Sequence, residues 1–268
     1  MGKWKAKTQM SESMALAIFL TLAGGFQDAY SYNCRGKVFA NAQTGNIVLL
    51  GQNLAMGNWS MALHYFMPLA AFISGVYVTE WVHQKYRDYR KIHWRQIVLV
   101  AEVLLLAAVG FMPQSVNMLA NVCLSFACAM QVNSFRKFKG LPCATTMCIG
   151  NMRSATEMLC KFHITKEASL WKKSKQYYLV IFIFAVGAAI GALMSFQFQE
   201  HAIWLAAVLL LVGFVLMFIR EDIETNPQIV NEWDVIKEDA EKLGAAVKEN
   251  LAEEIQEIQK GTHGDSNP

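Results

Sequence analysis

Six long apolar runs separated by short polar stretches dominate this chain. They lie at residues 13–33, 62–83, 96–112, 115–135, 177–196 and 203–219. Each run has about 17 to 22 residues, the length that an α-helix needs to cross a hydrocarbon core of roughly 30 Å. Apolar and polar residues do not alternate within the runs, which excludes a transmembrane β-barrel. The pattern predicts an all-α polytopic membrane protein with six transmembrane helices.

The first run has an alternative interpretation as a secretory signal peptide, because Lys3, Lys5 and Lys7 precede it. The run is long for that role, contains Asp28, and is not followed by a clear small-residue cleavage site. We therefore predict that it is the first membrane span.

Each set of three runs contains a polar break, and the two breaks have the same spacing. Asp28 and Asn46 are 18 residues apart, and so are Asn133 and Asn151. Because each set holds an odd number of spans, the two halves would enter the membrane from opposite sides. We predict a 3+3 inverted repeat, with repeat 1 at residues 13–112 and repeat 2 at residues 115–220.

A short apolar segment follows each break. Ile47–Leu54 is too short to span a bilayer, so it reads as a half-helix or re-entrant segment packed against protein or a wet cavity. Its counterpart, Asn151–Phe162, is more polar and carries Arg153 and Glu157 one turn apart.

Positive charge predicts the orientation. Residues 1–220 hold 20 Lys and Arg against 8 Asp and Glu, a net charge of +12. Seventeen of these cations lie in segments 1–12, 84–95 and 136–176, whereas the opposite side holds only Arg35 and Lys37. Lys and Arg concentrate in cytoplasmic loops, so we place both termini in the cytoplasm and the protein in the inner or plasma membrane. Nucleic-acid binding is not expected.

Residues 221–268 differ in kind, with 4 Lys and Arg against 13 Asp and Glu. After Pro227, apolar residues recur every three or four positions from Ile236 to Ile258, which predicts an amphipathic helix with an acidic outer face. Three roles stay open for this tail: docking on the basic loops, pairing with a second copy in a homo-oligomer, or solvation. The predicted domains are thus residues 1–12, 13–220 and 221–268.

Asp28 is the sharpest functional candidate, because a carboxylate inside a membrane helix is costly and usually faces a cavity or a partner. The alternative is a structural role near the outer surface. Asn46 and Asn151 open short helices, where they would cap free N–H groups or contact an anion drawn by the helix dipole. The predicted substrate-binding residues are Asp28, Asn41, Thr44, Asn46, Asn133 and Asn151.

Glu102 lies inside the third run and would pair with Arg153 or carry a proton. Gly187 and Gly191 have the spacing of a helix-packing face. The six cysteines form no C-x-x-C pair, so we read them as buried or free thiols. The sequence has no metal-ligand pattern, nucleophile elbow, P-loop or dinucleotide fingerprint. We expect no cofactor, no metal and no enzymatic activity.

These motifs resemble the YoaK family of predicted bacterial six-helix membrane proteins, whose function is unknown. Members typically read Gly-Phe-Val-Asp-Ala, then Asn-x-Thr-Gly-Asn, and here Gly25–Ala29 and Asn41–Asn46 take those places. The family's second half carries Gln-Asn-Ala and Thr-Thr-x-x-Thr-Gly-Asn, whereas this chain has Val132 and Ile149 at two of the polar positions. The resemblance implies the fold and a membrane location, with a site that is less polar on its second-half side.

The pattern favours a small-solute transporter or permease with its site between the two repeats. The alternative is a membrane scaffold that recruits a partner through its acidic tail. An integral-membrane enzyme is a third and weaker reading. The expected partners are the lipid bilayer and an unidentified small solute.

Overall fold

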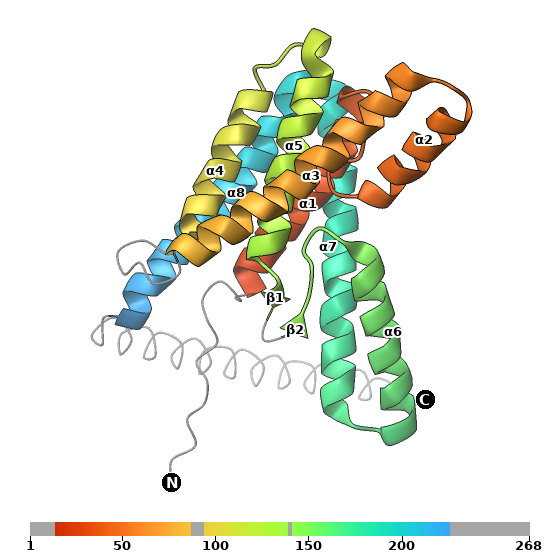
Figure 1. Ribbon diagram of the computed structural model, residues 1–268. Coiled ribbons are helices and arrows are strands. Elements are labelled where there is room, and N and C mark those ends of the chain that lie inside the picture. Colours follow the sequence, from red (N-terminus) through yellow and green to blue (C-terminus); the bar gives the residue numbers. More distant parts are fainter. Residues whose placement is uncertain (1–13, 87–93, 139–140, 226–268) are drawn as a thin grey trace, which may run out of the picture. The chain divides into compact units, whose positions relative to one another are not determined.

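A computed structural model describes residues 14–86, 94–138 and 141–225, and most of them are helical (Figure 1). Each of the six apolar runs forms a helix. The helices are α1 (Met14–Cys34), α2 (Gln43–Ala55), α3 (Trp59–Tyr86), α4 (Trp94–Val109), α5 (Asn117–Ser134), α6 (Cys148–Thr165), α7 (Ala168–Phe198) and α8 (Ile203–Thr225), with 3-10 turns η2 (Gln114–Val116) and η3 (Gln199–Ala202).

The chain divides into two compact units, residues 1–217 and 218–268. The first holds α1 to α7 and most of α8, and the described part of the second is the end of α8. The N-terminal segment 1–12, most of the 84–95 loop and the tail helix predicted after Pro227 lie outside the described residues.

The two short segments form longer helices than their apolar residues predict. α2 begins at Gln43 and α6 begins at Cys148, so each takes in the polar residues before its apolar stretch. Between α5 and α6, a two-stranded antiparallel hairpin pairs β1 (Lys137–Phe138) with β2 (Leu141–Pro142). The all-α prediction did not include this hairpin, whose strands are too short to leave an alternating pattern.

By length and composition alone, three described stretches are long and apolar enough to cross a membrane. They are Trp59–Tyr86, Gln114–Ser134 and Ala168–Leu216, and the last includes both α7 and α8. α1 carries Gln27 and Asp28 within its 21 residues, and α4 has only 16 residues. These criteria therefore identify three candidate spans among the described residues, fewer than the six that the apolar runs predict.

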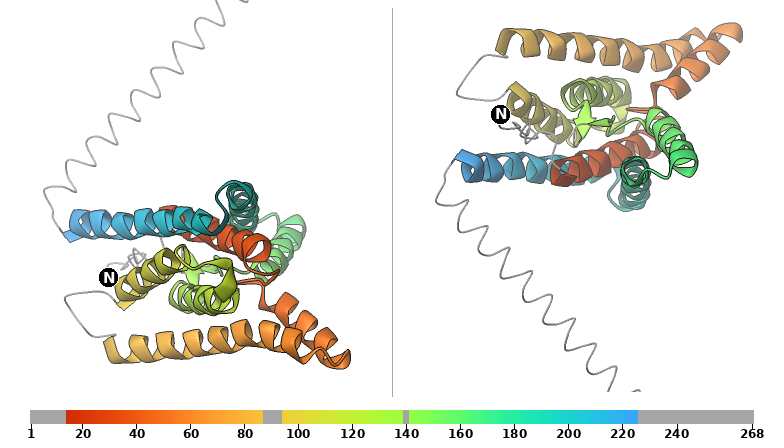
Figure 2. Two further views of the ribbon diagram at one scale, coloured as in Figure 1. Left: turned by 90° about the horizontal axis from the view of Figure 1, so that it is seen from above. Right: turned by 90° about the horizontal axis from the view of Figure 1, so that it is seen from below.

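The closest helix pairs join an early helix of the chain to a late one. α1 lies against α7, and α3 lies against α5. Glycines make these approaches close: a Cβ built at Gly191 would lie 2.7 Å from the carbonyl oxygen of Phe26, and one at Gly75 would lie 2.7 Å from that of Phe126. The two views in Figure 2 show α4 and α5 between α3 and α1. Gly187 and Gly191 thus form the predicted helix-packing face.

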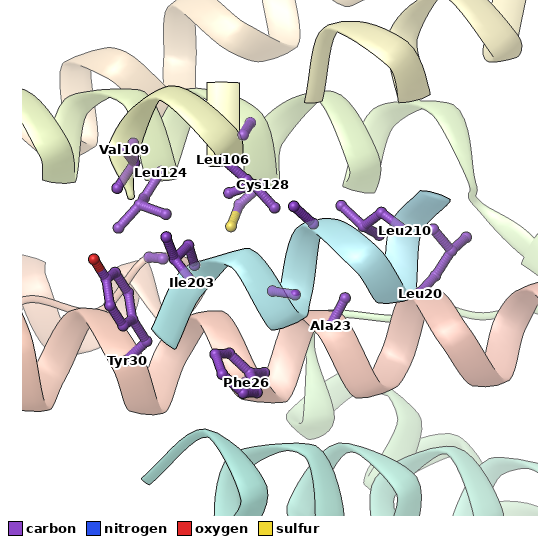
Figure 3. Close-up of a cluster of buried hydrophobic side chains, with 14 of the residues drawn as sticks. Leu20, Ala23, Phe26, Tyr30, Leu106, Val109, Leu124, Cys128, Ile203 and Leu210 are labelled. Carbon is purple, nitrogen blue, oxygen red and sulfur yellow. The ribbon is translucent and has the colours of Figure 1, made fainter. Parts of the chain in front are cut away.

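The main apolar core lies where α1, α4, α5 and α8 meet. Leu20 from α1, Leu106 from α4, Leu124 from α5 and Ile203 from α8 are all fully buried and belong to one cluster of side chains between these helices (Figure 3). Close packing of such side chains holds the four helices together by dispersion contacts, which is the main attraction between helices in lipid.

Arg35, which follows α1, is fully buried and ties α1 to the α4–α5 connection. Its guanidinium donates to the hydroxyl of Tyr30 at 2.9 Å, to Val109 O at 2.9 Å and to Asn117 Oδ1 at 3.0 Å. The backbone oxygen of Arg35 accepts from Asn121 Nδ2 at 2.6 Å. The sequence pattern treats Arg35 and Lys37 alike as loop cations, but Lys37 is exposed and only Arg35 serves as an anchor.

Candidate functional site

Both polar breaks meet at a pocket of about 310 Å³ between the two halves, which we call the Asp28 pocket. Asp28 comes from α1, and Thr44 comes from the first turn of α2. The first turn of α6 contributes Cys148 to Gly150, and Phe72 and Phe184 add apolar walls from α3 and α7. Two helix N-termini, each carrying positive partial charge, therefore share one cavity with a carboxylate.

The loop between α1 and α2 is folded around Asp28. The Oδ1 atom of this buried side chain accepts a hydrogen bond of 2.6 Å from the backbone N–H of Asn41. Asn41 Nδ2 in turn donates to the carbonyl oxygen of Gly24 at 3.0 Å. Asp28 thus has a structural role in holding this loop, and it also lines the Asp28 pocket.

Asn46 and Asn151 play matching structural roles one turn inside α2 and α6. Asn46 Nδ2 donates to Phe39 O at 2.7 Å, and Asn151 Nδ2 donates to Ala144 O at 2.7 Å. Each asparagine reaches back seven residues and fastens the loop that leads into its helix. Neither is the N-cap residue of its helix, and neither lines the Asp28 pocket.

A second cavity of about 480 Å³, the Asn133 pocket, lies next to the Asp28 pocket. It is lined by Asn133, Arg136 and Asn151, and it shares Met147 and Gly150 with the Asp28 pocket. The start of α6 therefore separates the two cavities. Of the six predicted substrate-binding residues, Asp28, Asn41 and Thr44 line the Asp28 pocket and Asn133 and Asn151 line its neighbour.

Asn133 belongs to a charged cluster at the end of α3. Its Nδ2 donates to Glu80 Oε2 at 3.3 Å, and Arg136 Nη2 binds both that carboxylate, at 3.1 Å, and Asn133 Oδ1. This cluster ties α3 to α5, so Asn133 does not reach the Asp28 pocket as the equal spacing of the breaks had indicated.

Glu102 and Arg153 do not form the ion pair considered for them. Glu102 is fully buried in α4, whereas Arg153 lies exposed on α6. The Glu102 carboxyl interacts with the side chain of Gln27, although neither carboxyl oxygen nor Gln27 Nε2 has a partner at full hydrogen-bond geometry within the described residues. Gln27 Oε1 accepts from Cys128 Sγ at 2.9 Å, which places a small polar cluster inside the helical core.

Thr146 was not predicted to be a site residue, although it lies in the Thr-Thr motif before α6. Its side chain lines the Asp28 pocket, is only 3% exposed, and has an Oγ1 atom without a partner among the described residues. Phe72 and Phe184 were not selected either, because an aromatic residue inside an apolar run carries no signal that it faces a cavity.

The far end of α6 has the character of a solvated surface. Lys161 Nζ donates to Glu157 Oε1 at 2.6 Å, and both side chains are exposed. This hydrogen bond holds the pKa of the Glu157 carboxyl below its usual value. α6 thus begins beside a cavity and ends among charges.

The helical architecture, the apolar stretches and the cavity at two helix starts are those of an integral membrane protein. Comparison with known families refines this class: residues 16–216 match the family described as "Protein of unknown function (DUF1275)", and the chain belongs to it. The match includes both breaks and ends before the acidic tail.

Among curated proteins, the chain is similar to "UPF0700 transmembrane protein YoaK" of Bacillus subtilis (strain 168). The two are 28% identical over 207 residues, which is 73% of this chain and 89% of the relative. No solved structure matches the chain. The resemblance to the YoaK family is therefore confirmed, and the membrane location agrees with the relative's printed name.

Proposed function

We propose that this protein is a small-solute transporter of the plasma membrane whose substrate site is the Asp28 pocket. The observation that carries the proposal is the meeting of two helix N-termini and an intramembrane carboxylate at one cavity. Broken helices whose N-termini point at a midplane site are a recurring design in secondary transporters. Asp28, Asn41 and Thr44 contact the solute, and Asn133 and Asn151 line its path beyond Met147.

The proposal includes six spans in a 3+3 inverted repeat, formed by α1, α3 and α4 in one half and α5, α7 and α8 in the other. The packing supports it, because α1 on α7 and α3 on α5 are equivalent contacts when the halves are exchanged. So are α2 on α3 and α6 on α7. The matching bonds of Asn46 and Asn151 lie at equivalent positions too.

Transport can be tested with a substitution that places a side chain in the Asp28 pocket without a clash against neighbouring backbone. Purified protein is first screened by thermal shift against a metabolite library, and hits are tested for uptake into proteoliposomes. A Cβ at Gly150 or at Gly51 meets nothing within 4 Å, but only Gly150 lines the pocket. We expect Gly150→Leu to abolish ligand shift and uptake, and Gly51→Leu to leave both unchanged.

Equal uptake by the two leucine variants would show that the solute does not pass the Asp28 pocket. Ligand binding without uptake by the wild type would instead favour the scaffold reading, in which the acidic tail recruits a partner.

Orientation is a separate prediction, based on the seventeen cations placed inside against Arg35 and Lys37 outside. The turns after α2 and after α6 lie at opposite ends in Figure 1, and Asn58 and Glu167 are exposed in them. In a cysteine-free background, we expect an impermeant maleimide to label Asn58→Cys in intact cells and Glu167→Cys only after permeabilisation. The reverse pattern would invert the topology.

A further inference from the structure

We propose that the solute of the Asp28 pocket is a small zwitterion with an apolar body, its ammonium group on Asp28 and its anionic group at the start of α6. This inference rests on the proposed function, because it assigns a chemical class to the same site. It starts from a difference between the two helix N-termini that share the cavity.

The loop that leads into α2 and the first turn of α2 already have hydrogen-bond partners within the protein. Its loop is held by Asp28, which accepts from the backbone N–H of Asn41, and backbone bonds join Gln43 N to Asn41 O at 2.8 Å and Gly45 N to Ala42 O at 2.9 Å. The carboxylate thus lies at the first break and supplies negative charge to this side of the pocket.

Among the described residues, no comparable backbone turn bonds are found at the start of α6. Neither Met147, the N-cap residue of α6, nor Ala42, the N-cap residue of α2, makes a side-chain capping bond. The first turn of α6 lines the pocket with Cys148, Ile149 and Gly150. The first N–H groups of a helix have no acceptor within it, and they carry the positive end of the dipole. Such an end attracts an anionic group of a ligand.

A buried polar side chain without a partner points to a ligand independently of the helix ends. Thr146 lines the pocket and is only 3% exposed. Its Oγ1 atom has no hydrogen-bond partner in the described part of the chain. A buried polar atom left unpaired is costly, so the Thr146 hydroxyl fits an acceptor group of a ligand beside α6. Asn41, by contrast, already binds Gly24 O and lies beside the Cys128 thiol.

The charges of the pocket select between simple ligand classes. Among the described residues, no Lys or Arg lines it, and Asp28 lies close enough to Cys148 for an electrostatic interaction. A lone anion at α6 would be repelled by Asp28, and a lone cation at Asp28 would leave the start of α6 without a partner. A zwitterion satisfies both ends.

The size and walls of the cavity fit a small amphipathic molecule. About 310 Å³ is at the lower end of the range for small-molecule sites. Phe72, Phe184 and Ile149 supply apolar surface between the two charged ends, and an aromatic face also favours an ammonium group. An amino acid with an aliphatic side chain has this chemistry.

The test uses three probes of nearly equal shape on the purified full chain. They are leucine, 4-methylpentanoate, which lacks the amino group, and 3-methylbutylamine, which lacks the carboxylate. Affinities are measured by calorimetry and thermal shift at pH 7. We expect leucine to bind at least about tenfold more tightly than either analogue, because each analogue leaves one charged contact unmade.

Two variants test the contacts of the two charged ends of the ligand separately. Asp28→Asn should lower leucine binding to the level of 4-methylpentanoate, and Thr146→Val should weaken leucine and 4-methylpentanoate but not 3-methylbutylamine. Thr146→Val keeps the shape and leaves the loop held by Asp28 intact, so it remains informative if Asp28→Asn fails to fold.

Equal binding of leucine and either analogue, or no binding of leucine, would overturn the assignment. The transport proposal fails separately. Leucine binding without uptake would refute transport and keep the zwitterion site, whereas uptake of an uncharged solute that Gly150→Leu blocks would keep transport and refute the zwitterion.

Discussion

Gly187→Ala is expected to prevent normal assembly of the α1–α7 pair. A Cβ at this position would overlap the backbone carbonyl oxygen of Leu22, and helix backbone cannot move aside as a flexible side chain can. The helices would have to separate along their whole contact, where Gly25 and Gly191 also pack against backbone. Overpacking costs roughly 1–3 kcal/mol and occasionally more, and a clash with rigid backbone belongs at the upper end of that range, which should lower the unfolding midpoint by roughly 5–10 °C.

Gly51→Ala is the matched control, because a Cβ at Gly51 in α2 meets nothing within 4 Å. Replacing a glycine inside a helix by alanine stabilises it by about 0.5–1 kcal/mol. The measurement is thermal unfolding in detergent with size-exclusion chromatography of both variants. Equal midpoints for the two would show that the close approach of α1 and α7 does not hold the fold together.

The helices themselves were predictable from the sequence, because long apolar runs leave few alternatives to helix in a bilayer. Each predicted run lies on a helix; α1 ends within one residue of the predicted position and α8 begins at the predicted Ile203, although α8 continues to Thr225, beyond the predicted end at residue 219. The start of α2 at Gln43 was not foreseen. Polar residues begin that helix because their side chains and Asp28 fold the preceding loop, which is a tertiary effect.

Part of the site was predictable as well. Asp28, Asn41 and Thr44 stand out as polar residues at a break in an apolar run, and they do line one cavity. Asn133 has the same spacing in the second half, but a local pair, Glu80 with Arg136, draws its side chain into another cavity. Sequence spacing carries no information on such competing partners.

Phe72 and Phe184 could not be predicted from the sequence as pocket residues, for a related reason. An apolar residue facing lipid and one facing a cavity look alike in a sequence, because both surfaces are apolar. Only the packing of α3 and α7 around the helix starts distinguishes them.

The role of Arg35 also depends on tertiary structure, because its side-chain acceptors include groups at the ends of α4 and α5. Arg35→Lys is expected to destabilise the protein by about 3 kcal/mol or more, because a lysine cannot reach Tyr30, Val109 and Asn117 together. The planar guanidinium satisfies three acceptors from three helices or their ends, and an ammonium group on a flexible stem leaves buried acceptors unpaired. Thermal unfolding of the purified variant measures the loss.

Lys37→Arg and Lys37→Met are the controls, since Lys37 is exposed and its ammonium group lies 4.6 Å from the ring of Tyr32 without a buried partner. An exposed cation–π contact contributes about 0.5–1 kcal/mol, so both variants should unfold close to the wild type. Arg35→Lys keeps the positive charge but loses the fork of donors, whereas Arg35→Met removes both. If the fork of donors is what matters, Arg35→Met and Arg35→Lys will both unfold well below the wild type. Full stability of Arg35→Lys would mean that charge alone is needed there, and full stability of Arg35→Met would mean that the acceptors of α4 and α5 find other donors.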